Sequence, residues 1–575
     1  MNIFRPEHPN PIWKRNEWIN LNGQWDFEFD FSVSGRERKW NEEKEFSHKI
    51  NVPFCPESKL SGIENTDFLN CVWYRRSFEI PKEYKDRRCI VHFGAVDYKA
   101  YIYVNSELAM THEGGYTSFE CDITKYLKDG ENVVTVCAED IMRAGRQPRG
   151  KQSEQYYSRG CDYTRTTGIW QTVWLEFVPQ TYIKTAKYYP DIENCKLSVS
   201  AIVCGKGELI AKAFYEGKEV GKASVKSNGG TVNFEIALSE KHLWEVGCGR
   251  LYDLELAYGE DKVLSYFGLR SVRLEGMKFL INEKSVFQRL VLDQGFYPDG
   301  IYTAPSAEAL ENDIKISLDA GFNGARLHEK VFEPLFLYYC DKLGYLAWGE
   351  YPNWGFDHTN IAFAHIYINE WREAIERDFN HPAIIGWCPF NETWNQHGCE
   401  QDNNILKSVY LETKALDTTR PCIDTSGNFH VVTDIYDVHN YNQDPVTFSE
   451  RYEDFLEKGS LYKKGGADAH FPRQQYSGQP FFVSEYGGIK WVMDKDEKGN
   501  AWGYGDGPKT EEEFIERYRG LTDALLDNKD MFGFCYTQLY DVEQEQNGLY
   551  TYSRKPKFDM KIFKKINSRK AKIED

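Results

Sequence analysis

The chain has 575 residues, 41% of them hydrophobic and 15% aromatic, so it is long enough for several domains with large cores. Its formal net charge of −18 argues against nucleic acid or an anionic membrane as a partner, because both carry negative charge. The aromatic content suits carbohydrate binding, in which a sugar face stacks on a ring, but β-rich proteins also carry many aromatics for packing alone. Composition does not decide between these two explanations.

Fourteen cysteines are scattered along the chain without a CxxC pair or a metal-like spacing with histidine. Most lie inside apolar stretches, as expected for reduced thiols in the core of a cytosolic protein. The first residues, Met1–Glu7, lack the apolar segment of a signal peptide, and no run is long enough to span a membrane. We therefore expect a cytoplasmic protein without membrane contact.

Residues 1–180 contain short alternating strands separated by turn residues, for example Gly23–Phe29, Cys71–Phe78 and Tyr101–Asn105. No helical period appears in this part, so the pattern predicts an all-β sandwich of the jelly-roll type. Residues 181–275 continue with short strands and turns rich in Gly and Asn, which predicts an immunoglobulin-like sandwich. We see no chemistry in this second part.

From residue 276 to 575 strand and helix patterns alternate, which predicts a (β/α)8 TIM barrel. Helices are expected over residues 307–321 and 332–343. A doubly wound sheet is disfavoured because no Gly-rich phosphate loop follows the first strand. The eight strand candidates are Ser285–Asp293, Asn323–His328, Tyr345–Glu350, Ile384–Glu392, Cys422–Ser426, Val438–Tyr441, Phe481–Glu485 and Met531–Gln538.

Two of these strands end in a glutamate, Glu392 and Glu485. A TIM barrel keeps its chemistry at the C-terminal ends of its strands, and strands four and seven lie roughly opposite across the mouth. A single glutamate there could be a helix cap or a surface charge. Two carboxylates facing one cleft are what cleavage of a glycosidic bond requires, since one gives a proton while the other stays charged.

Further side chains at the strand ends could complete such a site. Tyr441 ends strand six and Tyr486 follows Glu485, and either hydroxyl could hydrogen-bond the carboxylate that stays ionised. His328 and His439 lie at two other strand ends. A single histidine is more often structural, but two at one barrel mouth favour contacts with sugar hydroxyls.

Further candidates lie at other strand ends and in the loops of the barrel. Asp293, at the end of strand one, could bind a sugar hydroxyl or cap a loop. Trp354, Trp491 and Trp502 lie in loops after strands three and seven and could form a stacking wall, or pack a loop against the barrel. The residues that follow strand eight and could line the same pocket are Gln538, Asp541 and Glu543.

The chain resembles glycoside hydrolase family 2, the family of bacterial β-galactosidases, β-glucuronidases and β-mannosidases. The resemblance covers nearly the whole chain, and its two catalytic signatures are the most specific part. The segments that carry it are Glu17–Trp25, Gly168–Gln171, Phe267–Arg270, Asn391–Glu392 and Ser484–Gly487.

This resemblance implies a retaining double displacement. Glu392 would protonate the glycosidic oxygen and then act as base on water, while Glu485 would attack the anomeric carbon. Asn391 would hold the sugar 2-hydroxyl, and Tyr441 would orient the nucleophile. The two carboxyl groups should lie about 5–5.5 Å apart.

Glu392 must start protonated to act as an acid. We therefore expect its pKa to be raised, by burial beside Trp387 or Trp394 and by the negative charge of Glu485.

Departures from the family pattern bear on the substrate. β-Glucuronidases carry an Asn-x-Lys that pairs the uronate, whereas Gln544–Asn547 contains no lysine, so a uronic acid is disfavoured. Pro389–Trp394 and Arg326–Lys330 also differ from the motifs of the large β-galactosidases. The metal ligands of those enzymes find no match, so we expect no required metal and no cofactor.

We expect a neutral terminal sugar, with galactose first and arabinofuranose or galactofuranose next. The corresponding activities are β-galactosidase, α-L-arabinofuranosidase and β-galactofuranosidase. A transglycosylase would use the same residues, and a non-catalytic carbohydrate-binding protein would keep only the fold. The sequence leaves open whether the chain forms a homo-oligomer.

Overall fold

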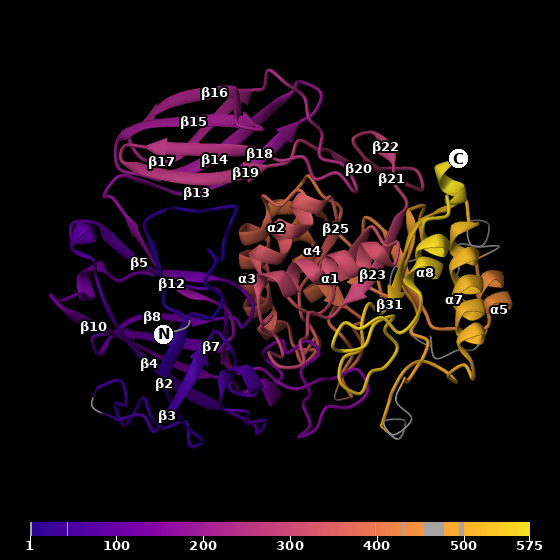
Figure 1. Cartoon of the computed structure of the whole chain (residues 1–575), viewed down its shortest axis with the longest axis horizontal. Coiled ribbons are helices and arrows are strands. Elements are labelled where there is room, and N and C mark those ends of the chain that lie inside the picture. The colour runs from indigo at the N-terminus through magenta and orange to yellow at the C-terminus, as the bar shows by residue number, and fades with distance from the viewer. Residues whose placement is uncertain (1–2, 43, 397, 428, 453–475, 494–499) are drawn as a thin grey trace.

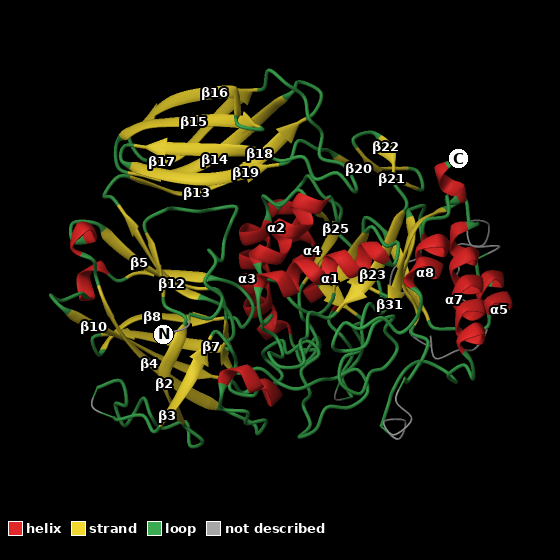
Figure 2. Ribbon diagram, viewed as in Figure 1, coloured by secondary structure: helices red, strands yellow, loops and turns green. Residues whose placement is uncertain are grey.

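The computed structural model describes residues 3–42, 44–396, 398–427, 429–452, 476–493 and 500–575. Two β-sandwiches lie beside a barrel of parallel strands (Figure 1). The long helices gather around the barrel (Figure 2). The predicted fold class, two sandwiches followed by a TIM barrel, is confirmed. No helix among the described residues is long and apolar enough to cross a membrane.

The first sandwich packs an antiparallel six-stranded sheet against a four-stranded sheet around one apolar core. The six strands, in sheet order, are β3 (His48–Val52), β2 (Gly23–Phe29), β4 (Cys71–Glu79), β10 (Glu131–Glu139), β7 (Lys99–Val104) and β8 (Glu107–Glu113). The four strands are β1 (Trp18–Asn20), β12 (Val173–Val178), β5 (Arg88–Phe93) and β9 (Phe119–Asp122).

The second sandwich shows the period of two that half-buried strands require. In β14, Leu197, Val199 and Ala201 are buried, while the serines between them are partly exposed. One sheet contains β13 (Tyr182–Asp191), β14 (Lys196–Cys204) and β17 (Gly230–Ala237). The other contains β16 (Lys218–Ser227), β15 (Gly207–Tyr215), β18 (Tyr252–Tyr258) and β19 (Asp261–Phe267).

The barrel is built on a parallel seven-stranded sheet that follows a three-stranded antiparallel sheet of β20 (Val272–Glu275), β21 (Lys278–Ile281) and β22 (Lys284–Ser285). An eighth segment, β28 (Thr425–Ser426), pairs in parallel with β27 (Phe390–Asn391). In sheet order the seven strands are β26 (Ile384–Cys388), β25 (Leu346–Glu350), β24 (Gly324–Leu327), β23 (Gln288–Asp293), β31 (Met531–Thr537), β30 (Phe481–Gly487) and β29 (Tyr436–Asn440).

Several predicted strands differ in their bounds from the observed ones; Cys422–Ser426, for example, is a strand only over Thr425–Ser426. The predicted strand from Ser285 begins only at Gln288, because Ser285 belongs to the preceding hairpin. The predicted strand Ile384–Glu392 is divided into β26 and β27 at Pro389, which has no backbone N–H to donate to a neighbouring strand. Both strands nevertheless direct the chain to the same end of the barrel.

Helices cover the outside of the barrel, and local signals explain their ends. Ser306 caps the first of them by accepting a hydrogen bond from the Ala309 amide, and Gly344 ends the second in the left-handed region at φ 67°. The helices are α1 (Ala307–Asp319), α2 (Pro334–Leu343), α3 (Ala364–Asp378), α4 (Asn403–Leu416), α5 (Pro445–Glu450), α7 (Glu511–Leu526) and α8 (Met560–Asn567).

A loop of the first sandwich, residues 145–165, reaches the barrel, and we call it the docking loop. In Figure 1 purple chain runs beside the yellow loops that follow the last barrel strand. The Arg149 amide donates to the Trp354 carbonyl at 2.7 Å, and the Gln544 side chain donates to the Gly160 carbonyl at 2.8 Å. The two parts of the molecule therefore meet at the barrel mouth.

Candidate active site

The two glutamates at the strand ends face the same imidazole. Glu392 directly follows β27, Glu485 lies within β30, and His439 lies near the end of β29. His439 Nδ1 is 2.6 Å from Glu392 Oε1 and 3.4 Å from Glu485 Oε2. Donor atoms of the three side chains all lie within 4.8 Å of one another, so they could also hold a cation.

The distance between the carboxyl groups of Glu392 and Glu485 bears on whether the reaction would retain or invert the anomeric configuration. Inverting glycosidases keep their carboxyl groups about 6.5–9.5 Å apart to admit a water molecule, whereas retaining ones keep them about 5–5.5 Å apart. Oxygens of Glu392 and Glu485 that lie within 4.8 Å of each other fit the retaining arrangement. Such a pair can attack a sugar directly from one side and protonate its leaving group from the other.

A buried arginine holds the nucleophile candidate and its neighbours. Arg326, 1% exposed at the end of β24, places Nη1 3.0 Å from Glu485 Oε1 and Nε 2.5 Å from Glu350 Oε1. Its Nη2 donates to Asn391 Oδ1 at 3.2 Å. In the sequence, Arg326 was noted only because Arg326–Lys330 differs from the motif of the large β-galactosidases. The sequence feature that could have indicated its role is an arginine inside an apolar barrel strand.

The structure distinguishes the two tyrosines that could bond the ionised carboxylate. The Tyr441 hydroxyl donates to Glu485 Oε2, and its ring stacks on that of Tyr504 with centroids 3.4 Å apart. The Tyr486 hydroxyl instead pairs with Thr522 Oγ1 at 2.8 Å. Burial raises the pKa of Tyr441 well above its usual value, so this hydroxyl stays protonated and remains a donor.

The pKa of Glu392 differs from the expectation. Burial alone would raise it, but the hydrogen bond and charge of His439, followed by the charges of Lys151 and Arg326, outweigh burial and lower the pKa. Burial would likewise lower the pKa of His439, yet Glu485 and Glu392 raise it. The contact with His439 therefore lowers, rather than raises, the pKa of Glu392, and the two side chains share a short hydrogen bond along which a proton can pass.

The expected burial of Glu392 beside Trp387 is wrong. The Trp387 indole N–H donates to Asp417 Oδ2 at 2.8 Å, and its ring packs edge-on against Trp371 of α3. This indole therefore lies on the helix side of the strand. Trp354 lies close to the acid, since its Nε1 donates to the Asn391 carbonyl at 3.2 Å, and its ring packs edge-on against that of Trp394, the other tryptophan expected there.

His328 lies beneath the nucleophile candidate. Its Nδ1 is 3.0 Å from Glu350 Oε2, and its Nε2 is 3.9 Å from Glu485 Oε1. Burial, followed by the charge of Lys151, lowers the pKa of His328 well below its usual value. This imidazole is therefore neutral near pH 7 and can offer one donor and one acceptor.

Several candidates have contacts that match their structural alternatives. Asp293 accepts from the Tyr540 hydroxyl and from the Gly295 amide at 2.9 Å, as a loop cap does, and burial raises its pKa to about 6. The Trp491 ring packs on the rings of Phe514 and Phe558. The structure does not bring Asp293 or Trp491 into contact with the two glutamates.

The candidates after β31 connect loops to one another. Gln538 donates to Asn547 Oδ1 at 2.9 Å, and Asp541 lies 2.6 Å from Lys557 Nζ. Glu543 accepts from the Thr164 amide of the docking loop at 3.1 Å. The Trp502 ring packs edge-on against Tyr504, the stacking partner of Tyr441.

The docking loop supplies residues that sequence reasoning missed. Lys151 is 5% exposed, and its Nζ lies 3.4 Å from the centre of the Trp354 ring. Burial alone would lower the pKa of Lys151, but Cys161, Glu329 and the two glutamates of the site raise it. No local pattern marks Lys151, since it lies in a loop of a different domain.

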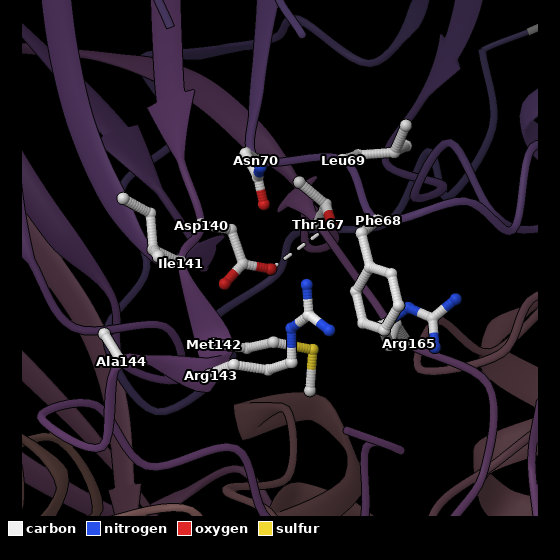
Figure 3. A pocket seen from close by; sticks show the side chains of 10 residues that line it. All are labelled: Phe68, Leu69, Asn70, Asp140, Ile141, Met142, Arg143, Ala144, Arg165 and Thr167. Atoms are coloured by element: carbon white, nitrogen blue, oxygen red, sulfur yellow. Dashed lines mark hydrogen bonds between the residues drawn. The ribbon is translucent and has the colours of Figure 1, made fainter. Parts of the chain in front are cut away.

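A separate cavity of about 210 Å³ lies in the first sandwich (Figure 3). Its one carboxylate, Asp140, accepts hydrogen bonds from Gln147 and Thr167 at 2.7 and 3.3 Å. The guanidinium groups of Arg143 and Arg165 lie over the Phe68 ring at 4.2 and 4.1 Å. A lining with a single carboxylate lacks the pair that glycoside cleavage requires.

Comparisons with known proteins agree with this geometry. Residues 19–179 match the model described as glycosyl hydrolases family 2, sugar binding domain, and residues 272–571 match that family's TIM barrel domain. A β-glucuronidase of Streptococcus agalactiae is 22% identical over 96% of both chains. A β-galactosidase of Thermoanaerobacter pseudethanolicus is 26% identical over 74% of this chain, and the match spans only 57% of that protein.

The solved structure of an uncultured Clostridium β-glucuronidase superposes with a TM-score of 0.78 at 21% identity, covering 98% of this chain and 99% of that one. At that identity the likeness shows the fold alone. The two family models together match most of the sequence, and the barrel model alone matches more than half of it. The chain therefore belongs to glycosyl hydrolases family 2, a family of retaining O-glycosyl hydrolases.

Proposed function

We propose that this protein is an exo-acting β-glycosidase that removes a terminal neutral sugar with retention, with a β-galactoside as the first candidate. One observation carries the proposal: two carboxylates from different barrel strands contact the same imidazole, with oxygens within 4.8 Å of one another. A retaining glycosidase uses such a pair of neighbouring carboxylates, one as nucleophile and the other as acid/base.

In the first step Glu485 attacks the anomeric carbon and the bond to the leaving-group oxygen breaks. Glu392 gives that oxygen a proton, which His439 Nδ1, 2.6 Å away, can supply. In the second step Glu392 takes a proton from water, the water oxygen attacks the anomeric carbon, and the ester bond to Glu485 breaks. The products are the free sugar of unchanged configuration and the alcohol.

The neighbouring residues support these roles. The guanidinium of Arg326 and the hydroxyl of Tyr441 each hold one oxygen of Glu485, which keeps the carboxylate in position for attack. The side-chain oxygen of Asn391 accepts from Arg326, and among the described residues its amide N–H groups have no acceptor, so they can serve a sugar 2-hydroxyl. Trp354 adds an aromatic face beside the acid.

The preference for a neutral sugar rests on the segment after β31. Where β-glucuronidases carry a lysine for the uronate, this chain has Glu545-Gln546-Asn547. The Glu545 carboxyl is buried and accepts from Tyr163 and from Asn547. Burial raises the pKa of Glu545 to about 7. Above that pH the Glu545 carboxylate is negatively charged and would repel the carboxylate of a uronic acid substrate.

A β-glucuronidase is the second candidate, because several relatives bear that name and because Lys151 presents a cation near the two glutamates. An α-L-arabinofuranosidase or a β-galactofuranosidase would use the same residues. The fourteen cysteines are all free, which supports the cytoplasmic location that we propose.

A panel of aryl glycosides tests the proposal: β-galactoside, α-L-arabinofuranoside, β-galactofuranoside, β-mannoside and β-glucuronide. We expect the highest kcat/KM on the β-galactoside, the lowest on the β-glucuronide, and a first product of unchanged anomeric configuration by NMR. Highest activity on the β-glucuronide would replace the first candidate by the second. Binding without turnover would indicate a carbohydrate-binding protein, and an inverted product would refute the mechanism.

A further inference from the structure

The docking loop inserts a positively charged side chain into the barrel mouth. Lys151 is 5% exposed, although lysine is seldom buried without a partner. Among the described residues none accepts a hydrogen bond from its Nζ or forms an ion pair with it, and its close neighbour is the face of Trp354 at 3.4 Å. Three N–H donors of a buried ammonium are thus available to a ligand.

Other buried lysines of the barrel differ in this respect. Lys330, 3% exposed, donates to the carbonyls of Gly295 and Tyr302. Lys557, 7% exposed, donates to Asp541 at 2.6 Å and to the Trp491 carbonyl at 2.8 Å. Their ammonium groups are occupied by the protein itself. That of Lys151 lies on the Trp354 ring, a contact that uses its charge, but among the described residues no acceptor uses its three N–H groups.

The position of Lys151 connects it to the reaction. The Trp354 ring beneath its ammonium donates to the Asn391 carbonyl at 3.2 Å, and Asn391 immediately precedes Glu392. The charge of Lys151 also acts on Glu392 and on His328. The ammonium therefore lies beside the chain segment that carries Glu392, where a sugar bound between the two glutamates can meet it.

We propose that Lys151 is a substrate-contacting specificity residue that donates a hydrogen bond to a hydroxyl oxygen of the terminal sugar. This inference rests on the proposed function and adds to it a binding contact from outside the barrel. The loop is held rigidly enough for such a role, because it is hydrogen-bonded to the barrel at both ends, through Arg149 and through Thr164.

The test pairs enzyme variants with deoxy substrates. The variants are Lys151→Met, which keeps the length of the side chain, Lys151→Arg, which keeps the charge, and Lys330→Met as a buried-lysine control. The substrates are the best aryl glycoside of the panel and its analogues lacking one ring hydroxyl each. Thermal unfolding of each variant is measured alongside kcat and KM, so that a loss of folding is not mistaken for a loss of binding.

We expect Lys151→Met to lower kcat/KM on the parent substrate by about 10- to 100-fold, the usual range for a hydrogen bond to a charged group. With the natural enzyme, kcat/KM on one deoxy analogue should be lower than on the parent substrate by a similar factor. With Lys151→Met, kcat/KM on that analogue and on the parent substrate should be the same. Lys151→Arg should recover part of the loss. Lys330→Met should lower the unfolding temperature and keep the same ranking of deoxy substrates.

Two outcomes overturn the inference while the proposed function stands. In the first, folded Lys151→Met cleaves the parent substrate as well as the natural enzyme does. In the second, removing each hydroxyl lowers kcat/KM by the same factor in the natural enzyme as in Lys151→Met, which means that no hydroxyl is coupled to Lys151. If the natural enzyme cleaves none of the glycosides, the proposed function fails and the inference falls with it.

Discussion

Removing one oxygen atom, in Tyr441→Phe, should slow catalysis while leaving the fold in place. The hydroxyl donates to Glu485 Oε2, which also lies 3.4 Å from His439 Nδ1. The ring itself remains held by its stack on Tyr504 at 3.4 Å. The variant therefore loses one donor to the nucleophile and little packing.

The size of the effect follows from the kind of bond that is lost. A hydrogen bond to a charged group contributes about 1.5–3 kcal/mol. At about 1.4 kcal/mol for each factor of ten, kcat should fall about 10- to 100-fold. Arg326 still holds the other oxygen at 3.0 Å, so the nucleophile keeps its place and the loss stays below that of removing the carboxylate.

The assay is kcat on an aryl glycoside with a good leaving group, where breakdown of the glycosyl-enzyme limits turnover. Tyr486→Phe is the matched control, because it removes a buried hydroxyl whose partner is Thr522. It should cost about 0.5–1.5 kcal/mol of folding stability and leave kcat within about twofold. A Tyr441→Phe enzyme with unchanged kcat, or equal losses in the two variants, would refute the reasoning.

Three further predictions test the remaining assignments. Glu485→Ala should fold but lose activity by orders of magnitude, and azide should restore part of it with formation of a glycosyl azide of inverted configuration; a folded variant that stays active would exclude Glu485 as nucleophile. Glu392→Gln should cost far more with a poor leaving group than with an activated aryl group that needs no proton, and equal losses would contradict its role as acid. Burial raises the pKa of Glu370, which contacts two tyrosine hydroxyls, to about 8. Since the folded pKa lies above the unfolded one, its contribution to stability is complete below about pH 4.5 and is lost as the pH rises towards 8, so Glu370→Gln should flatten the fall of unfolding temperature between pH 5 and 8.

The strand ends were predictable because their signal is local. An apolar strand that ends in glutamate is visible in the sequence, and the barrel topology brings strands four and seven to one mouth. The place of His439 beside them follows from the same rule. The contact of Tyr441, rather than Tyr486, with Glu485 also agrees with the prediction drawn from the family resemblance.

Other features depend on partners that are distant in sequence. Asp293 lies at the end of its strand, like the other candidate residues, yet its carboxylate accepts from the Tyr540 hydroxyl, and no local pattern indicates that partner. The lowered pKa of Glu392 depends on an imidazole at 2.6 Å, whereas the prediction weighed only burial and Glu485. Lys151 was missed because it reaches the site across the surface between two domains.

The docking loop bears on whether the barrel can act without the first sandwich. Since the docking loop is hydrogen-bonded to the barrel mouth and carries Lys151, we expect an excised barrel to lack part of the proposed site even if every strand formed correctly. Mild denaturation that breaks the hydrogen bonds of the docking loop to Trp354 and Gln544 should abolish turnover before the barrel itself unfolds. Catalysis would then serve as a sensitive gauge of whether the two halves are assembled.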